Sequence, residues 1–130
     1  MAGVRLGFIA GLMLLTVAVP GIAAEKLAFD QARFDTAQQA NRPILVDITA
    51  RACLICRAQE PIIDRLAAEP QFKDLTIFQV DFPSQNDVVR AFRAQYRSTL
   101  IAFKGKSETG RSVGDTRAAS IEALAQSALK

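Results

Sequence analysis

The sequence predicts an α/β domain with a central mixed β-sheet flanked by helices. Three short apolar runs, at residues 44–49, 75–81 and 99–104, alternate with stretches of helical periodicity. Strands that are joined through helices pair in parallel within one sheet. The last two predicted strands are joined by a short turn at Gly105, which implies an antiparallel hairpin at one edge of the sheet.

The first half of the domain predicts a helix, a buried strand and a second helix. Residues 29–41 have apolar side chains near helical spacing and begin beside Asp30, a suitable N-cap. The strand at 44–49 is apolar apart from Asp47, as expected for a central strand covered on both faces. The second helix spans residues 53–68. Its predicted inward-facing residues are Ile62, Ile63, Leu66 and Ala67, and Pro61 is expected to kink it.

The second half of the domain repeats this alternation and ends on a helix. The strand at 75–81 is followed by a helix at 85–95, and then by the strand at 99–104. A more polar strand at 109–113 is expected at the edge of the sheet. The terminal helix spans residues 116–129. The inward-facing residues are Val88, Val89 and Phe92 in the first of these helices and Ile121, Leu124 and Ala125 in the second.

Residues 1–24 have the order of a secretory signal peptide. Arg5 precedes an apolar run over residues 6–19, and small residues ending at Ala24 offer a cleavage site. The run is shorter than the roughly 20 apolar residues that a membrane-spanning helix needs. We expect cleavage after Ala24, which leaves one domain over residues 25–130. An uncleaved N-terminal membrane anchor is the alternative.

The composition excludes several classes of function. The formal net charge of the 130-residue chain is +3, and basic residues are spread among acidic ones, so no nucleic-acid partner is expected. The chain has no histidine. This excludes Cys–His and Ser–His nucleophile pairs and any histidine metal ligand. No cofactor and no resident metal are therefore predicted.

The two cysteines of the chain, Cys53 and Cys56, lie between the strand at 44–49 and the helix that follows it. A Cys-x-x-Cys pair at a strand-to-helix junction is typical of redox chemistry. The helix N-terminus favours the thiolate of the first cysteine, and the second lies within reach of a mixed disulfide. We expect Cys53 to be partly exposed and Cys56 to be largely buried. A purely structural disulfide is the alternative, although so short a loop would contribute only about 2 kcal/mol.

The spacing around these cysteines resembles that of the thioredoxin family, and the resemblance covers residues 29–129. Asp47 lies six residues before Cys53, as the buried acid of thioredoxins does. Pro61, five residues after Cys56, matches the proline of their active-site helix. The resemblance implies a thioredoxin-like fold for the domain, with Cys53 as the attacking cysteine and Cys56 as the resolving one.

The resemblance extends to the strand pair beside the active site. Residues 98–103, with Gly114 eleven residues later, match that pair in spacing. In thioredoxins the backbone at this place pairs with the bound substrate. The resemblance thus implies substrate contacts by Leu54, Ile55, Ser98 and Thr99, and structural roles for Pro61 and Gly114.

Several positions depart from the family pattern. Ala52 stands where thioredoxins carry a tryptophan, and Ile77 stands where a lysine often accompanies the buried acid. Ser98 occupies the position of the family's cis-proline. Because a cis bond before a non-proline residue costs about 2.5–4 kcal/mol, the Arg97–Ser98 bond is expected to be trans. Restoring the proline by Ser98→Pro is expected to shift the protein toward general thioredoxin behaviour.

Asp47 is the predicted proton acceptor of the reaction. It is a lone acid in an apolar strand, and burial would raise its pKa toward the range in which it can take and return the proton of Cys56. A solvated carboxylate at the end of the strand is the alternative.

These observations predict a thiol–disulfide oxidoreductase that acts through Cys53 and Cys56 in the periplasm or another exported location. It would be tethered to the membrane if residues 1–24 are not cleaved. The expected partners are exported proteins with thiols or disulfides and an upstream redox donor, soluble or membrane-bound; the protein itself is expected to be a monomer. Two alternatives stay open: a redox-inert module that docks peptides through Leu54 and Ile55, and a carrier that holds metal through its two thiolates.

Overall fold

The computed structural model describes Gly3, residues 15–17 and residues 21–130 of the chain. The predicted signal peptide over residues 1–24 lies largely outside these described residues. Within them, none of the helices combines the length and the apolar character that crossing a membrane requires.

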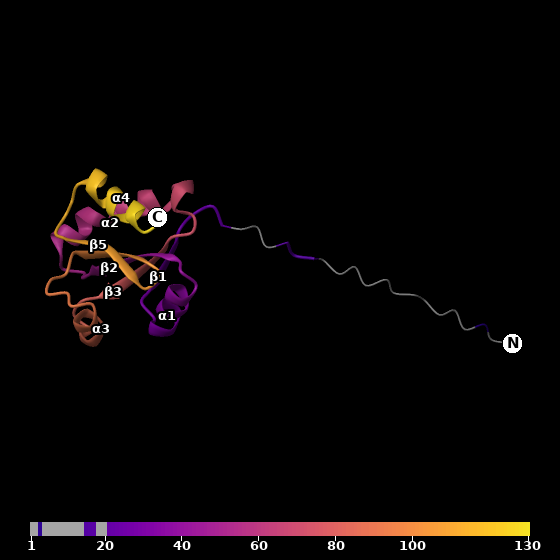
Figure 1. Ribbon diagram of the computed structural model, residues 1–130, viewed down its shortest axis with the longest axis horizontal. Coiled ribbons are helices and arrows are strands. Elements are labelled where there is room, and N and C mark those ends of the chain that lie inside the picture. The colour runs from indigo at the N-terminus through magenta and orange to yellow at the C-terminus, as the bar shows by residue number, and fades with distance from the viewer. Residues whose placement is uncertain (1–2, 4–14, 18–20) are drawn as a thin grey trace.

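The described chain folds into a five-stranded sheet with helices on both sides (Figure 1). Its elements, in order, are β1 (Glu25–Ala28), α1 (Gln31–Gln39), β2 (Pro43–Thr49), α2 (Leu54–Ala67), a 3-10 turn (Pro70–Phe72), β3 (Thr76–Asp81), α3 (Asn86–Ala91), β4 (Thr99–Lys104), β5 (Ser107–Val113) and α4 (Ala118–Ser127).

The sheet is mixed, and β2 lies at its centre. The strand order is β1-β3-β2-β4-β5, with β3 parallel to both β1 and β2. β4 pairs antiparallel with β2 and with β5, to which the turn at Gly105 joins it. The predicted mixed sheet flanked by helices is therefore confirmed.

Each face of the sheet has its own apolar core. One face is covered by α1 and α3, and its core includes Phe34 and Val46. The other face is covered by α2 and α4, and its core includes Leu45 and Ile63. Because successive side chains of a strand point to opposite faces, Asp47 lies on the same face of β2 as Leu45. The strand thus directs this acid toward α2, the helix that begins beside the cysteines.

The sequence does not predict β1. Its four residues include the charged Glu25 and Lys26, and they are too few to show a pattern of alternating apolar residues. In the structure their burial does not alternate either. β1 forms because its backbone pairs with β3, in a register that runs from Glu25 opposite Thr76 to Ala28 opposite Gln79. This pairing places Lys26 at the sheet edge beside α2, which matters for the site described below.

Predicted and observed bounds also differ in other elements. α1 is shorter than the predicted 29–41, α4 is shorter than the predicted 116–129, and α3 and β5 differ as well. α3 ends at Ala91, short of the predicted residue 95, because Arg93 adopts a left-handed conformation with φ 52°. The N–H of Ala94 then bonds back to the carbonyl of Val89, as at many helix C-termini. β5 begins at Ser107, two residues before the predicted start, since its first residues pair with the end of β4.

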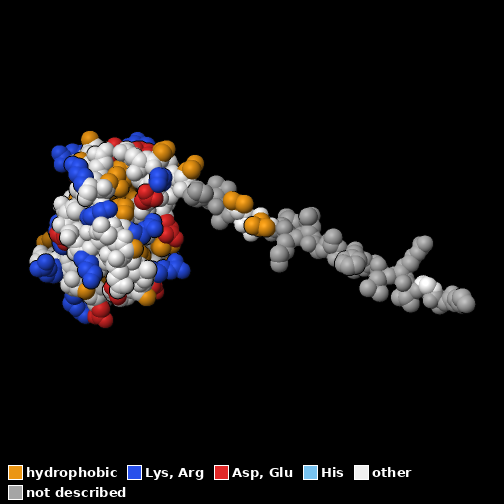
Figure 2. Space-filling model, turned by 45° about the vertical axis from the view of Figure 1, so that its right-hand side comes forward, with side chains coloured by type: hydrophobic (Ala, Val, Ile, Leu, Met, Phe, Trp, Pro, Cys, Tyr) orange, Lys and Arg blue, Asp and Glu red, His pale blue; other side chains and the backbone are white. Residues whose placement is uncertain are grey.

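Charges of both signs are interspersed over the face of the molecule drawn in Figure 2. Some charged residues of the domain pair locally, as Arg111 does with Glu108 and Arg117 with Asp115. The face in this view therefore lacks a continuous basic surface of the kind that nucleic-acid binding uses.

Candidate active site

The two cysteines form a disulfide at the start of α2, with their Cα atoms 5.2 Å apart. Cys53 is the N-cap of α2 and has an extended backbone, with φ −137°. Its Sγ accepts the backbone N–H of Cys56 at 3.1 Å. Sulfur thus takes the place that a side-chain oxygen usually has at a helix N-cap, at the positive end of the helix dipole. Once the disulfide is reduced, this arrangement stabilises negative charge on Cys53.

Both cysteines are buried in the disulfide form. Cys53 is 7% exposed and Cys56 is 5% exposed, so the expected contrast between the two is not seen in this state. The exposed part of the motif is the apolar pair between them: Leu54 is 82% exposed and Ile55 is 43% exposed. A sulfur that approaches the disulfide would therefore meet two apolar side chains first.

Asp47 is buried on the face of β2 that α2 covers. Its side chain is only 5% exposed, and burial raises the pKa of this carboxyl above its ordinary value of 3.8. A hydrogen bond from Gln79 Nε2 to Asp47 Oδ2, at 3.3 Å, opposes that shift. The alternative of a solvated carboxylate is therefore not what the structure describes.

A cavity of about 400 Å³ connects Asp47 with the second cysteine. Asp47 and Cys56 both line it, and so do the exposed side chains of Arg51, Arg57 and Glu60. A cavity of this size that is lined by several charged side chains can hold water. Water in the cavity would give a proton a route between the Cys56 sulfur and the Asp47 carboxylate.

Gln79 is the residue of β3 that lies opposite Asp47, so the expectation that placed Ile77 there is wrong. Ile77 pairs with Leu45, two residues earlier on the same face of the sheet. A positive charge is nevertheless present, because β1 supplies Lys26. Burial remains the largest influence on the pKa of Asp47, and the charge of Lys26 lowers that pKa.

Lys26 is held against α2 by two acids. Its Nζ lies 2.6 Å from Asp64 Oδ1 and 4.0 Å from Glu60 Oε1. Both of these acids raise the pKa of Asp47, in opposition to Lys26. The proton affinity of Asp47 therefore depends on one base from the edge strand and two acids from the active-site helix.

The loop before β4 brings Ser98 next to α2. Ser98 is buried, its peptide bond is trans, and its φ is 61°. Its N–H donates to the carbonyl of Ile48 at 2.7 Å. Its own carbonyl accepts the N–H of Gly114 at 3.0 Å and the side chain of Gln59 at 3.2 Å.

A family model described as Thioredoxin matches residues 25–127. The chain belongs to the thioredoxin family. It is 33% identical to Trxlp from Edwardsiella tarda EIB202, whose crystal structure superposes with a TM-score of 0.75 over 77% of this chain and 97% of that one.

Two mycobacterial proteins are also similar to part of this chain. A thioredoxin of Mycobacterium bovis is 34% identical over 74 residues, which are 57% of this chain and 63% of the relative. The bifunctional thioredoxin reductase/thioredoxin of Mycobacterium leprae is 31% identical over 85 residues, which are 65% of this chain and 18% of the relative. The chain thus spans less than two thirds of the length of either of these proteins.

The predicted substrate contacts of this thioredoxin-family chain divide into two groups. Leu54 and Ile55 lie at the surface, whereas Ser98 and Thr99 are 5% and 1% exposed. The Thr99 hydroxyl donates to the carbonyl of Tyr96 at 2.5 Å, so it forms a hydrogen bond within its own loop. The side chains of Ser98 and Thr99 are therefore not offered to a substrate as those of Leu54 and Ile55 are.

The two predicted structural residues lie in different settings. Pro61 is exposed and stands within α2, which continues through it as one helix. Gly114 has φ 70°, a conformation that favours glycine. A Cβ at this position would lie 3.9 Å from Ile55 Cδ1, so the glycine is next to the surface part of the cysteine motif.

Gln59 is a site residue that the sequence analysis missed. It is 1% exposed, and its Nε2 donates to the carbonyls of Ser98 and Asp115. Its position was readable: it lies three and four residues before Ile62 and Ile63, on the predicted inner side of the helix. A polar residue in that apolar stripe was the available signal.

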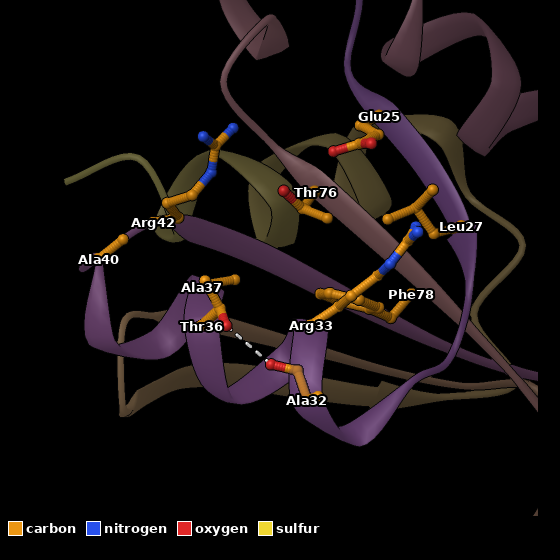
Figure 3. A pocket seen from close by; sticks show the side chains of 10 residues that line it. All are labelled: Glu25, Leu27, Ala32, Arg33, Thr36, Ala37, Ala40, Arg42, Thr76 and Phe78. Atoms are coloured by element: carbon orange, nitrogen blue, oxygen red, sulfur yellow. Dashed lines mark hydrogen bonds between the residues drawn. The ribbon is translucent and has the colours of Figure 1, made fainter.

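A separate cavity of about 540 Å³ lies between α1 and the edge formed by β1 and β3 (Figure 3). Arg33 and Thr36 from α1, Leu27 from β1 and Phe78 from β3 are among its lining residues. None of the predicted site residues lines it. Across the described part of the chain, no group of three or more acidic or cysteine side chains is placed to hold a metal ion.

Proposed function

We propose that this protein is a thiol–disulfide oxidoreductase that exchanges disulfides with protein thiols through Cys53 and Cys56. The observation that carries the proposal is the disulfide at the first turn of α2, where Cys53 Sγ accepts the N–H of Cys56. A disulfide with a purely structural role does not need a helix N-terminus that stabilises a thiolate. A nucleophile does, because the thiolate is the species that attacks.

The reaction consists of two exchange steps. In the reducing direction, the Cys53 thiolate attacks one sulfur of the target disulfide, whose S–S bond breaks and releases one target thiolate. Cys56, as a thiolate, then attacks the Cys53 sulfur of the mixed disulfide and releases the second target thiolate. Two electrons pass to the target, and Cys53 and Cys56 end as the disulfide. The oxidising direction is the same sequence reversed.

Asp47 serves the second step as proton acceptor. The Cys56 thiol must lose its proton before it can attack, and the cavity that Cys56 shares with Asp47 gives the proton a path. The pKa of Asp47 is raised by burial, which brings its proton affinity closer to that of a thiol. The carboxyl can then return the proton when the disulfide is reduced again.

The apolar surface beside the disulfide receives the substrate. Leu54 and Ile55 are exposed, and Val113, next to Gly114, is 56% exposed. Exposed apolar side chains that gather at one place mark a surface for a protein partner. Such a surface suits a peptide segment around the target cysteine.

We also propose that the protein works outside the cytoplasm, on exported proteins and with an upstream redox donor. The support is the basic, apolar and small-residue order of residues 1–24. N-terminal sequencing of the protein recovered from the periplasmic fraction tests this part. A mature chain that begins at Glu25 supports it, and a full-length chain found only in the cytoplasm contradicts it.

The exchange itself is tested by trapping. The Cys56→Ser variant should accumulate mixed disulfides with partner proteins, because the resolving thiol is gone, and dithiothreitol should release them. The matched Cys53→Ser variant should trap none. If neither variant retains partners that dithiothreitol releases, yet the apolar surface still binds peptides, the protein is a redox-inert docking module instead.

A further inference from the structure

We propose that Gln59 is a positioning residue for disulfide exchange, because it fixes the loop that carries Ser98 beside the active site. This inference rests on the proposed exchange at Cys53. Gln59 lies one helical turn after Cys56 and donates from Nε2 to the carbonyl of Ser98, at 3.2 Å, and to the carbonyl of Asp115, at 2.9 Å. One side chain of the active-site helix thus joins two loops.

Both of these loops border the surface where the substrate must lie. Ser98 bonds through its carbonyl to the N–H of Gly114, and Gly114 in turn adjoins Ile55 of the cysteine motif. Asp115 follows directly, and its carboxylate accepts the backbone N–H of Arg117 at 3.0 Å. Movement of either loop would therefore change the shape of the surface beside the disulfide.

The conformation of Ser98 needs an external support. Its φ of 61° lies in the left-handed region, which a residue other than glycine adopts only where its surroundings hold it there. The N–H of Ser98 is held by Ile48, and its carbonyl is held by Gln59 and Gly114. Of these three partners, Gln59 alone acts through its side chain, so it is the one that a substitution can remove.

The loop also uses its own carbonyl groups internally. The Thr99 hydroxyl donates to the carbonyl of Tyr96, and the Ser98 hydroxyl donates to the carbonyl of Arg97. The carbonyls of Tyr96 and Arg97 therefore each already accept a hydrogen bond from within the loop. What the loop offers is its shape, and that shape depends on the bond from Gln59.

Stability alone does not account for a glutamine at this place. Gln59 is 1% exposed, and its Oε1 has no hydrogen-bond partner within the described residues. A buried acceptor without a partner costs free energy, which an apolar side chain of the same length would avoid. This imbalance points to a role in placing the two loops.

The test compares the parent with Gln59→Met, which keeps the length of the side chain and removes both hydrogen bonds. Each protein is reduced chemically, freed of reductant and mixed with one of two oxidised substrates. One is a disulfide-linked peptide, which must lie against the loops, and the other is cystamine, which is too small to reach them. Gln126→Met, at a partly exposed glutamine of α4, is the matched control and should react like the parent with both substrates.

We expect Gln59→Met to lose about tenfold or more in its second-order rate with the peptide, as misplaced binding groups do, and less than about twofold with cystamine. Equal losses with both substrates, or no loss with either, would overturn the proposal. Gln59→Asn keeps the amide group but shortens the side chain by one methylene, so it should show the same selective loss of rate with the peptide. This variant replaces Gln59→Met in the test if Gln59→Met does not fold.

Amide exchange gives a readout independent of turnover. In Gln59→Met the N–H groups of Ser98 and Gly114 should exchange at least about tenfold faster, whereas that of Val46 in the central strand should not change. Unchanged exchange at Ser98 and Gly114 would contradict the proposal. If the parent reduces neither substrate, the proposed exchange itself fails; if the parent and Gln59→Met reduce both equally well, only the role of Gln59 fails.

Discussion

The backbone N–H of Cys56 donates to the Sγ of Cys53 at 3.1 Å, across the first turn of α2. The same sulfur is thus the N-cap of the helix and the nucleophile that the proposed mechanism requires. Cys56 lies on the inner side of this turn, where it shares a cavity with the buried Asp47. Attack and resolution are therefore assigned by position along one helix.

The two cysteines should differ in reactivity once they are reduced. In Cys56→Ser, the remaining Cys53 should be alkylated by iodoacetamide at least about tenfold faster at pH 7 than the remaining Cys56 in Cys53→Ser, because only Cys53 faces the helix N-terminus as its N-cap. Serine is a good N-cap, so Cys53→Ser should keep the start of the helix. Equal alkylation rates in the two variants would remove the assignment of attacker and resolver.

Asp47→Asn should slow the resolving step at neutral pH by about a hundredfold, the lower end of the range for a positioned general base. The measurement is the rate at which a preformed mixed disulfide on Cys53 releases its partner. Asp87→Asn, which neutralises an exposed acid of α3, is the matched control and should release its partner at the parental rate. Unchanged release in Asp47→Asn would leave Asp47 a structural residue.

The same substitution should change how stability depends on pH. Because the pKa of Asp47 is raised in the folded protein, the folded state binds this proton more tightly than the unfolded chain. The stabilisation that this proton gives to the folded protein is fully present when the pH is below 3.8, the ordinary pKa of the group. It decreases as the pH rises through the pKa of Asp47 in the folded state, and at higher pH it is lost. Urea unfolding across this range should show the fall in the parent and not in Asp47→Asn. Parallel curves would contradict the burial of the charge.

Lys26→Gln should move the pH dependence of the resolving step to higher pH. The charge of Lys26 lowers the pKa of Asp47, so its removal makes the carboxyl ionise later. The loss of a partly exposed ion pair with Asp64 should cost no more than about 1 kcal/mol of stability. Lys73→Gln, which removes an exposed pair with Asp74, is the control. A pH profile that stays in place in Lys26→Gln would show that Lys26 does not act on the site.

Ser98→Pro should destabilise the protein by more than about 1 kcal/mol. From the sequence alone, this change was expected to shift the protein toward general thioredoxin behaviour. The conformation of the loop in the structure leads us to expect a loss of stability instead. Proline cannot adopt φ 61° and would lose the N–H that bonds to Ile48 at 2.7 Å. Ser98→Gly suits the positive φ and should stay within about 1 kcal/mol of the parent in urea unfolding. A Ser98→Pro variant as stable as Ser98→Gly would mean that the loop switches readily to another arrangement.

Strong periodic patterns made most of the fold predictable. The apolar runs of β2, β3 and β4 and the amphipathic helices lie where the sequence places them. β1 was missed because four residues with two charges carry no pattern of their own, and only pairing with β3 makes them a strand. That omission also hid Lys26, whose part in the site depends on this pairing.

The relative positions of Cys53, Cys56 and Asp47 were predictable from their spacing along the chain. The partner of Asp47 across the sheet was not predictable, because it depends on the register of β3 against β2. This register places Gln79, and not Ile77, opposite Asp47. The position of Gln59 was readable from its helix, but its two acceptors come from loops far along the sequence. Contacts of that kind need the folded structure.

The reduction potential of the Cys53–Cys56 couple decides whether this disulfide is active in exchange. The protein is equilibrated with glutathione or dithiothreitol redox buffers, and the fraction of disulfide is followed by alkylation and mass measurement. We expect one reversible two-electron transition between about −270 and −120 mV, the range of exchange-active dithiols. A transition below about −300 mV, where structural disulfides lie, would contradict this expectation.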